Sequence, residues 1–288
     1  MDTYFLPKLL EQFVVFLEKQ GKSKFTVVAY KKDIEQFIGF LSTRDKTDIR
    51  EVKKDDIEAF ISNLINNLNY TKKSASRKLN SGRTLFRYLK HEGIIDVNPA
   101  FDISHPKYTQ SMPRILTKLE YRGLRDVAKE DPRTYALVEV LLQTGIKIGE
   151  LAELHLEDVK EDTLHIRPYG KNIERDVPLN KAAKKAVEDY IKARGTTTED
   201  KHIFITRTGH PLLIRNIRQI IDRCFQEVGI ENATVNDLRN TFIAHQLTNG
   251  ASLEYIAKIV GHRRLSSTER FLNLVKQEAE RKEKLGEL

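Results

Sequence analysis

Apolar residues recur at three- and four-residue intervals through most of the first 90 positions of the chain. That interval places them along one face of an α-helix, so the pattern predicts amphipathic helices that pack on one another. Four such stretches, joined by short polar turns, make a four-helix unit within the usual size of a domain. The stretches cover residues 10–17, 27–41, 57–68 and 79–89.

A proline-containing stretch interrupts this pattern after Asn98. Pro106 and Pro113 enclose a polar segment, which favours an interdomain linker. Thr117 and Glu120 then have the spacing of a capping box, which marks the start of a helix. We therefore predict an N-terminal helical domain at 1–103, a linker at 104–116 and a C-terminal domain at 117–288.

The second domain combines helical periodicity with one strand-like region. Residues 163–167 and 175–179 read as strands, and between them Tyr169-Gly170-Lys171-Asn172 reads as a hairpin turn. The predicted fold class is therefore mainly α, with a helical first domain and an α+β second domain that contains a small β-hairpin. Helical periodicity continues in residues 182–191, 214–228, 235–247 and 253–260.

The composition excludes several classes of protein. The 288 residues include 49 Lys and Arg against 41 Asp and Glu, a net charge of +8. No apolar run approaches the roughly 20 residues that cross a bilayer, and the N-terminus lacks a secretion signal, so we expect a cytoplasmic protein without a membrane partner. The single cysteine, Cys224, cannot form an internal disulfide, and no Cys and His residues have zinc-ligand spacing. We expect neither a metal nor another cofactor.

Positive charge is concentrated in residues 71–90, which contain seven basic residues and no acid. On a helix most of these cations would lie opposite the apolar face, where they could contact a phosphate backbone. A solvated lysine-rich face is the alternative, although such faces usually mix both signs. The candidate DNA-binding residues are Lys72, Lys73, Arg77, Lys78, Arg83, Arg87 and Lys90.

The remaining charge is shared between the two parts of the chain. Residues 1–106 carry 18 basic and 14 acidic residues, and residues 107–288 carry 31 and 27. Each part therefore has the same excess of positive charge. This is the distribution expected if both domains contact DNA.

Four separated motifs stand out in the second domain. In order and spacing they resemble the tyrosine recombinase family, which includes the phage integrases and the Xer-like enzymes. The resemblance extends over nearly the whole chain, including the linker and the helical first domain, which is SAM-like in that family. The motifs are TGIKIGEL at 144–151, Lys171 with RDVPL at 175–179, VNDLRNTF at 235–242, and VGH at 260–262 followed by SSTERF at 266–271.

The resemblance implies a two-domain clamp around double-stranded DNA and phosphoryl transfer without a metal. In that family a tyrosine oxygen attacks the scissile phosphate, forms a 3'-phosphotyrosyl link and releases a 5'-hydroxyl. Two arginines hold the nonbridging oxygens, a hairpin lysine protonates the leaving oxygen, and two further donors orient the phosphate. The C-terminal segment docks onto a neighbouring protomer, so the resemblance also implies a homo-oligomer, a dimer or a tetramer on DNA.

Only half of the family's catalytic positions are retained in this chain. Lys171 matches the hairpin lysine, Arg239 the second arginine and His262 the late histidine. Lys147 replaces the first arginine and lacks its planar fork, while Asn236 replaces a histidine or lysine and cannot exchange a proton. The sixth position is decisive: Phe271 replaces the tyrosine, and a phenylalanine ring has no oxygen with which to attack.

The substitutions leave three functions open. The first hypothesis is a pseudoenzyme that binds a specific duplex site in DNA recombination or integration, alone or beside an active recombinase partner. The second is an active recombinase whose nucleophile was replaced by mutation. A helical protein-interaction module without DNA binding is the third hypothesis. For Arg239, which an apolar helix would bury, we expect an anionic partner, either a phosphate or a carboxylate such as Glu150.

Overall fold

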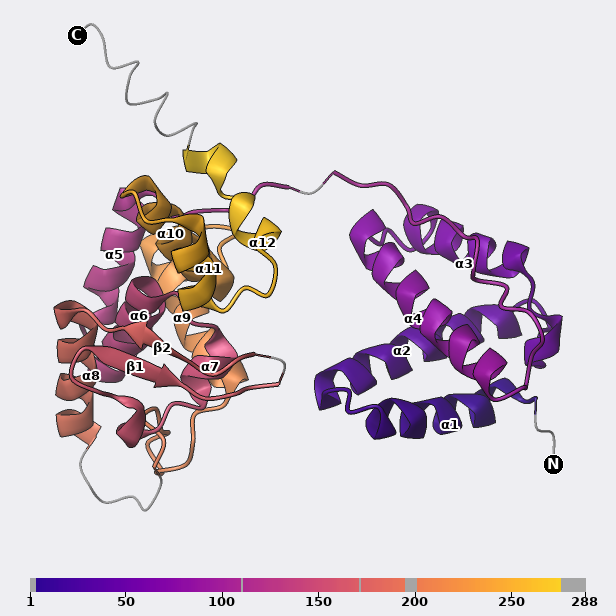
Figure 1. Cartoon of the computed structure of the whole chain (residues 1–288), viewed down its shortest axis with the longest axis horizontal. Coiled ribbons are helices and arrows are strands. Elements are labelled where there is room, and N and C mark those ends of the chain that lie inside the picture. Colours follow the sequence, from indigo (N-terminus) through magenta and orange to yellow (C-terminus); the bar gives the residue numbers. More distant parts are fainter. Residues whose placement is uncertain (1–3, 110, 171, 195–200, 276–288) are drawn as a thin grey trace, which may run out of the picture. The chain divides into compact units, whose positions relative to one another are not determined.

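The computed structural model describes residues 4–109, 111–170, 172–194 and 201–275. Contacts divide the chain into two compact units, Met1–Gln110 and Ser111–Leu288, and each is described here by itself (Figure 1). None of the described helices is both long and apolar enough to cross a membrane.

The described part of the first unit is helical, as predicted. Side-chain caps define two of its helix starts, because Ser23 accepts a hydrogen bond from the Thr26 N–H and Thr71 accepts one from the Ser74 N–H. The helices are α1 (Leu6–Lys19), α2 (Lys24–Ser42), the 3₁₀ helix η1 (Ile49–Glu51), α3 (Lys54–Asn66) and α4 (Lys72–His91).

Aromatic rings join these helices into one core. Phe37 of α2 packs against Phe60 of α3 and Phe86 of α4, with ring centroids 5.1 and 6.2 Å apart. Phe13 of α1 is fully buried in the same cluster. The apolar faces read from the sequence therefore meet in one place, which leaves the polar face of α4 toward solvent.

The second unit is built around α6, which contacts α5, α7, α8, α9 and α10. Figure 1 shows the hairpin and the C-terminal helices beside this group. The elements are α5 (Lys118–Ala128), α6 (Pro132–Thr144), α7 (Ile148–Ala152), the 3₁₀ helix η2 (Leu156–Asp158), β1 (Thr163–Ile166), β2 (Arg175–Pro178), α8 (Lys181–Arg194), α9 (Ile214–Val228), α10 (Val235–Thr248), α11 (Leu253–Val260) and α12 (Ser266–Glu269).

The predicted hairpin is present and antiparallel. Leu164 of β1 pairs with Val177 of β2, and both side chains are fully buried. The neighbouring pair, His165 and Asp176, lies on the other face and shares a hydrogen bond of 2.9 Å. The strand alternation predicted from the sequence thus directs one face of the hairpin into the core.

Candidate anion-binding site

The turn between α6 and α7 forms one wall of the site. Gly145 ends α6 with φ of 63°, and an added Cβ would lie 2.3 Å from the ring of Phe242, so only glycine fits. Lys147 then precedes α7, and its backbone N–H donates to Glu150 Oε2 over 2.9 Å. The TGIKIGEL motif therefore contains the end of α6 and the beginning of α7.

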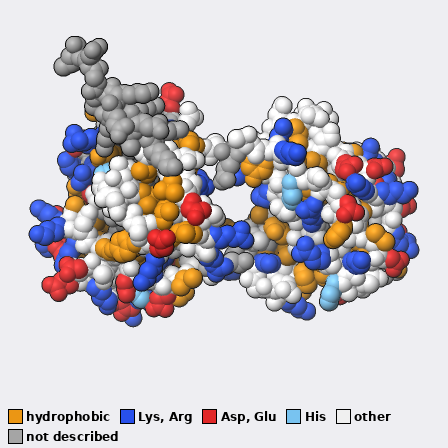
Figure 2. All heavy atoms as spheres, turned by 45° about the horizontal axis from the view of Figure 1, so that its top comes forward, with side chains coloured by type: hydrophobic (Ala, Val, Ile, Leu, Met, Phe, Trp, Pro, Cys, Tyr) orange, Lys and Arg blue, Asp and Glu red, His pale blue; other side chains and the backbone are white. Residues whose placement is uncertain are grey.

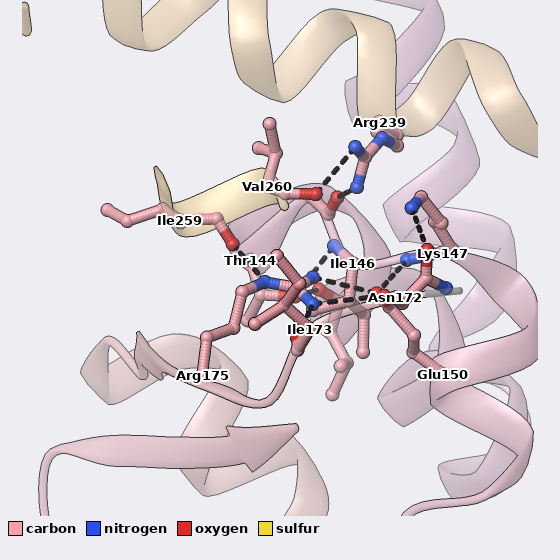
Figure 3. A network of polar contacts seen from close by, with 12 residues as sticks. Thr144, Ile146, Lys147, Glu150, Asn172, Ile173, Arg175, Arg239, Ile259 and Val260 are labelled. Atoms are coloured by element: carbon pink, nitrogen blue, oxygen red, sulfur yellow. Dashed lines mark hydrogen bonds and ion pairs between the residues drawn. The ribbon is translucent and has the colours of Figure 1, made fainter. Parts of the chain in front are cut away.

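A buried ion pair lies behind this turn. The Glu150 carboxylate accepts two hydrogen bonds from the Arg175 guanidinium, of 3.0 and 2.8 Å, and both side chains are almost inaccessible (Figure 3). Arg175 Nε also donates to the carbonyl of Ile259 over 2.6 Å. Burial alone would raise the pKa of Glu150, but the bonds from Arg175 and the Lys147 N–H outweigh it, so its pKa lies below the usual value.

Arg239 of α10 is the most deeply buried cation of the site. Its two terminal nitrogens donate to the carbonyls of Gly145 and Val260 over 2.5 and 2.7 Å (Figure 3). Burial, reinforced by Arg175, lowers the pKa of Arg239 to about 10, although Glu150 counteracts it. Of the two anionic partners expected for Arg239, a phosphate or a carboxylate such as Glu150, the carboxylate is not found among the described residues, because Glu150 bonds to Arg175.

Lys147 lies beside Arg239 on the opposite side of the turn. Its Nζ donates to Asn172 Oδ1 over 2.5 Å (Figure 3). Burial lowers the pKa of Lys147, Glu150 counteracts this, and the positive charges of Arg239 and Arg175 lower it further. The motifs at 144–151, 175–179 and 235–242 therefore converge, because Arg175 bonds to Glu150 and Arg239 bonds to the carbonyl of Gly145.

His262 follows α11 and lies near Arg239 and Lys147. Its Nδ1 shares a hydrogen bond of 2.8 Å with Oγ1 of Thr268, a fully buried residue. Burial first, and then the charges of Arg239 and Lys147, lower the pKa of His262 to about 4. The imidazole is therefore neutral at pH 7 and can donate or accept one further hydrogen bond.

Asn236 lies at the start of α10, one turn before Arg239, and its side chain is exposed. It lines an open cavity of about 840 Å³ together with Ile148 of α7 and Arg218 of α9. Its side chain makes no hydrogen bond to the described residues. Lys171 lies outside the described residues, as does the predicted C-terminal tail from residue 276 onward.

Phe271 belongs to the hydrophobic core of the second unit. Its side chain is 2% exposed, and the guanidinium of Arg270 lies 5.5 Å from its ring centroid. The short helix α12 occupies the residues just before Phe271, and Thr268 within it bonds to His262. The hydroxyl of Thr268 is therefore engaged and buried.

The seven cations of α4 do not share one environment. Lys72, Lys73, Arg87 and Lys90 are exposed and make no ion pair with the described residues. Lys78 does not point to solvent as a DNA-binding residue should, because it is 7% exposed and donates to Asp33 of α2 over 2.9 Å. Arg77, half exposed, also donates to Asp33.

Arg83 is engaged with the segment that follows α4. Its guanidinium donates to the carbonyls of Ala100 and Ile103 and contacts His105 Nε2 over 2.8 Å. Burial and the charge of Arg83 lower the pKa of His105. Residues 71–90 therefore include cations that face solvent and cations that hydrogen-bond within the first unit. On the face drawn in Figure 2, Lys and Arg side chains are interspersed with Asp and Glu.

Sequence reasoning missed the roles of several residues in the site. Arg175 and Thr268 were identified only as members of motifs, and Asn172 only as part of a turn. In the structure Arg175 bonds to Glu150, Asn172 to Lys147 and Thr268 to His262. Among the described residues, no group of three His, Cys, Asp or Glu side chains could hold a metal ion. The site is instead lined by donors, which suits one tetrahedral anion.

The fold and the site define a class of protein: a mainly helical, two-unit chain whose second unit brings Lys147, Arg239 and His262 close together. Comparison with known families agrees with this class. Residues 109–278 match the phage integrase family, and residues 10–93 match the phage integrase N-terminal SAM-like domain. The chain belongs to the phage integrase family and is a Xer-like tyrosine recombinase relative.

Individual relatives support this assignment along most of the chain. The tyrosine recombinase XerC of Thermodesulfovibrio yellowstonii is 33% identical over 265 residues, which cover 87% of this chain and 86% of the relative. The structure of a lambda integrase dimer bound to a COC' core site is similar with a TM-score of 0.77, at 18% identity, covering 93% of this chain and 77% of that one. A lambda integrase tetramer bound to a Holliday junction is similar with a TM-score of 0.76, at 19% identity, covering 90% and 78%. The predicted fold class is confirmed.

Proposed function

We propose that this chain binds a specific duplex DNA site in recombination, holds one backbone phosphate beside Arg239, and does not cut the strand. The buried Arg239 guanidinium carries this proposal, because two carbonyls orient it and no described carboxylate forms an ion pair with it. Burying such a charge is costly unless an anion pairs with it. A DNA phosphate is the anion that the family's chemistry supplies.

The remaining residues of the pocket support binding better than cleavage. Lys147 and the neutral His262 can each donate to a phosphate oxygen. Phe271 has no oxygen, and the nearby Thr268 hydroxyl already bonds to His262. Asn236 can donate but cannot relay a proton. Phosphoryl transfer needs an in-line nucleophile, and these side chains supply none.

The proposal assigns DNA contacts to both predicted domains, 1–103 and 117–288, joined by the linker at 104–116. The lambda integrase structures contain a dimer on a core site and a tetramer on a Holliday junction. We extend this to a homo-oligomer of the present chain, or a mixed complex with an active recombinase, on DNA in the cytoplasm. In such a complex the active partner would cut and this chain would hold the site.

A nicked suicide duplex tests the absence of cleavage, because release of a short strand traps any covalent protein-DNA adduct. The native chain should bind the duplex and form no adduct. Covalent adducts with the native chain would contradict the proposal, and absence of duplex binding even at low salt would favour the protein-interaction module.

Restoring the missing groups tests how much of the pocket is retained. Phe271→Tyr alone should give few adducts, because Lys147 and Asn236 remain substituted. Phe271→Tyr with Lys147→Arg and Asn236→His should give more, while the same triple variant with Arg239→Ala should give none. Abundant adducts from Phe271→Tyr alone would instead favour an active recombinase that lost only its nucleophile.

A further inference from the structure

The hairpin turn contacts α7 through the residue that replaces the family's first arginine. Asn172 Oδ1 accepts a hydrogen bond from Lys147 Nζ over 2.5 Å (Figure 3). The backbone N–H of Asn172 donates to the carbonyl of Tyr169 over 2.9 Å, which closes this part of the turn. The position of the lysine ammonium is thus linked to the conformation of the hairpin.

A second contact holds the same turn on α7. Gly149 lies under the ring of Tyr169, and a Cβ added at Gly149 would be 2.7 Å from Tyr169 Cε1 and 3.2 Å from Cζ. Real side chains do not approach so closely, so the ring can occupy this place only because residue 149 is glycine. Tyr169 therefore fixes the turn from one side while Asn172 bonds to Lys147 from the other.

Lysine needs such support more than arginine does. A guanidinium is planar and presents its donors as a rigid fork, whereas an ammonium rotates on a flexible four-carbon stem. The amide oxygen of Asn172 satisfies one ammonium N–H without cancelling its charge. Two further N–H groups stay available for an anion.

We propose that Asn172 is a positioning residue that orients the Lys147 ammonium toward the anion pocket, and that the Tyr169 ring on Gly149 holds Asn172 in place. The identity of the anion as a DNA phosphate rests on the proposed function. The hairpin turn then supplies the orientation that was lost when lysine replaced arginine.

A double-mutant cycle in the full chain tests this role, with inorganic phosphate as the probe and the His262 imidazole NMR signal as the reporter. Asn172→Leu should weaken phosphate binding about tenfold when residue 147 is lysine, because a charge-assisted hydrogen bond is removed. In the Lys147→Arg background the same substitution should change binding less than about twofold. Equal losses in both backgrounds, or no loss beside lysine, would overturn the proposal.

Gly149→Ala tests the second contact, with Gly39→Ala as its matched control. Both glycines lie within helices, but a Cβ at Gly39 meets nothing within 4 Å. Gly149→Ala should displace the Tyr169 ring and weaken phosphate binding, whereas Gly39→Ala should leave it unchanged. Tyr169→Leu removes the ring without altering α7 and should reproduce the loss. Native phosphate affinity in a folded Tyr169→Leu variant would contradict the role of the ring.

This test is separable from the test of the proposed function. Failure of the native chain to bind duplex DNA would refute the DNA site, but the phosphate cycle would still measure the coupling of Asn172 to Lys147. Loss of that coupling with normal duplex binding would refute the positioning role alone.

Discussion

Two arginines of the second unit have different kinds of partner although both side chains are buried. Arg175 has a carboxylate partner, Glu150, and therefore stabilises the fold. Arg239 donates only to carbonyls among the described residues and forms no ion pair with them. Charge type alone did not separate them in the sequence, because the partner of each lies far away along the chain. Only the tertiary structure shows which of the two arginines pairs with a carboxylate.

His262 should titrate far below an ordinary histidine. Its pKa of about 4 in the folded chain is below the value near 6.5 of an unfolded histidine, so between these pH values only the unfolded state binds the proton. The free energy of unfolding should therefore rise with pH from about 4 to about 6.5. Thermal unfolding of the native chain and of His262→Gln should differ in this slope, with the variant less dependent on pH.

Bound DNA should raise the pKa of His262, because a phosphate beside the imidazole favours its charged form. An NMR titration of the His262 ring with and without duplex measures the shift. An unchanged midpoint in the complex would mean that no phosphate approaches His262.

Cys224 should be unreactive in the folded protein. Burial, with a smaller effect of Glu227, raises the pKa of its thiol to about 11, so the thiolate is scarce at pH 8. A disulfide reagent should modify it only in denaturant, where the thiol is exposed. Rapid modification of the native chain would show that α9 opens readily.

At the scale of elements, α4 carries both buried and exposed polar side chains. Its apolar face packs in the core, and Lys78 and Ser81 approach α2 to bond to the buried Asp33. The exposed Lys72 and Lys90 remain near its ends. Helix periodicity predicted the apolar face, but the contact with Asp33 joins residues 45 positions apart. Periodicity contains no information on such a pair.

Asp33→Ala should destabilise the first unit strongly. The substitution leaves the Lys78 ammonium buried without its carboxylate, a loss of about 3–5 kcal/mol in the free energy of unfolding. Glu35→Ala, which removes an exposed pair with Lys31 at 3.8 Å, is the matched control and should cost less than about 0.5 kcal/mol. Denaturant unfolding measures both, and similar losses for the two variants would contradict the role of Asp33.

Most helices and strands were predicted from the sequence. The four N-terminal helices, the hairpin and the capping box at Thr117 and Glu120 follow from local spacing, and the structure confirms them. The candidate site was only partly readable. Lys147 and Arg239 were identified, but the bonds to Asn172 and to Gly145 depend on how the hairpin and α10 pack. Local patterns cannot specify those distances.

For the whole molecule, the net charge of +8 should promote DNA binding through the exposed cations that form no ion pair with a carboxylate. Binding to duplex DNA should weaken as salt increases, because each phosphate contact releases counterions. Lys73→Gln and Arg87→Gln should each reduce the slope of log affinity against log salt by about 0.9. Lys19→Gln, an exposed cation of α1, is the control and should leave the slope unchanged. Equal slopes for all three variants would exclude α4 as a DNA contact.

The sequence by itself determined the helical periodicity, the hairpin, the order of the four motifs and the absence of a tyrosine oxygen at Phe271. These properties depend on residue type and on short intervals along the chain. Only the tertiary structure decided which cations are free, because Asp33, Glu150 and the carbonyls of Gly145 and Val260 reach their partners through packing. A charge acts on an external anion only where folding leaves it without an internal one.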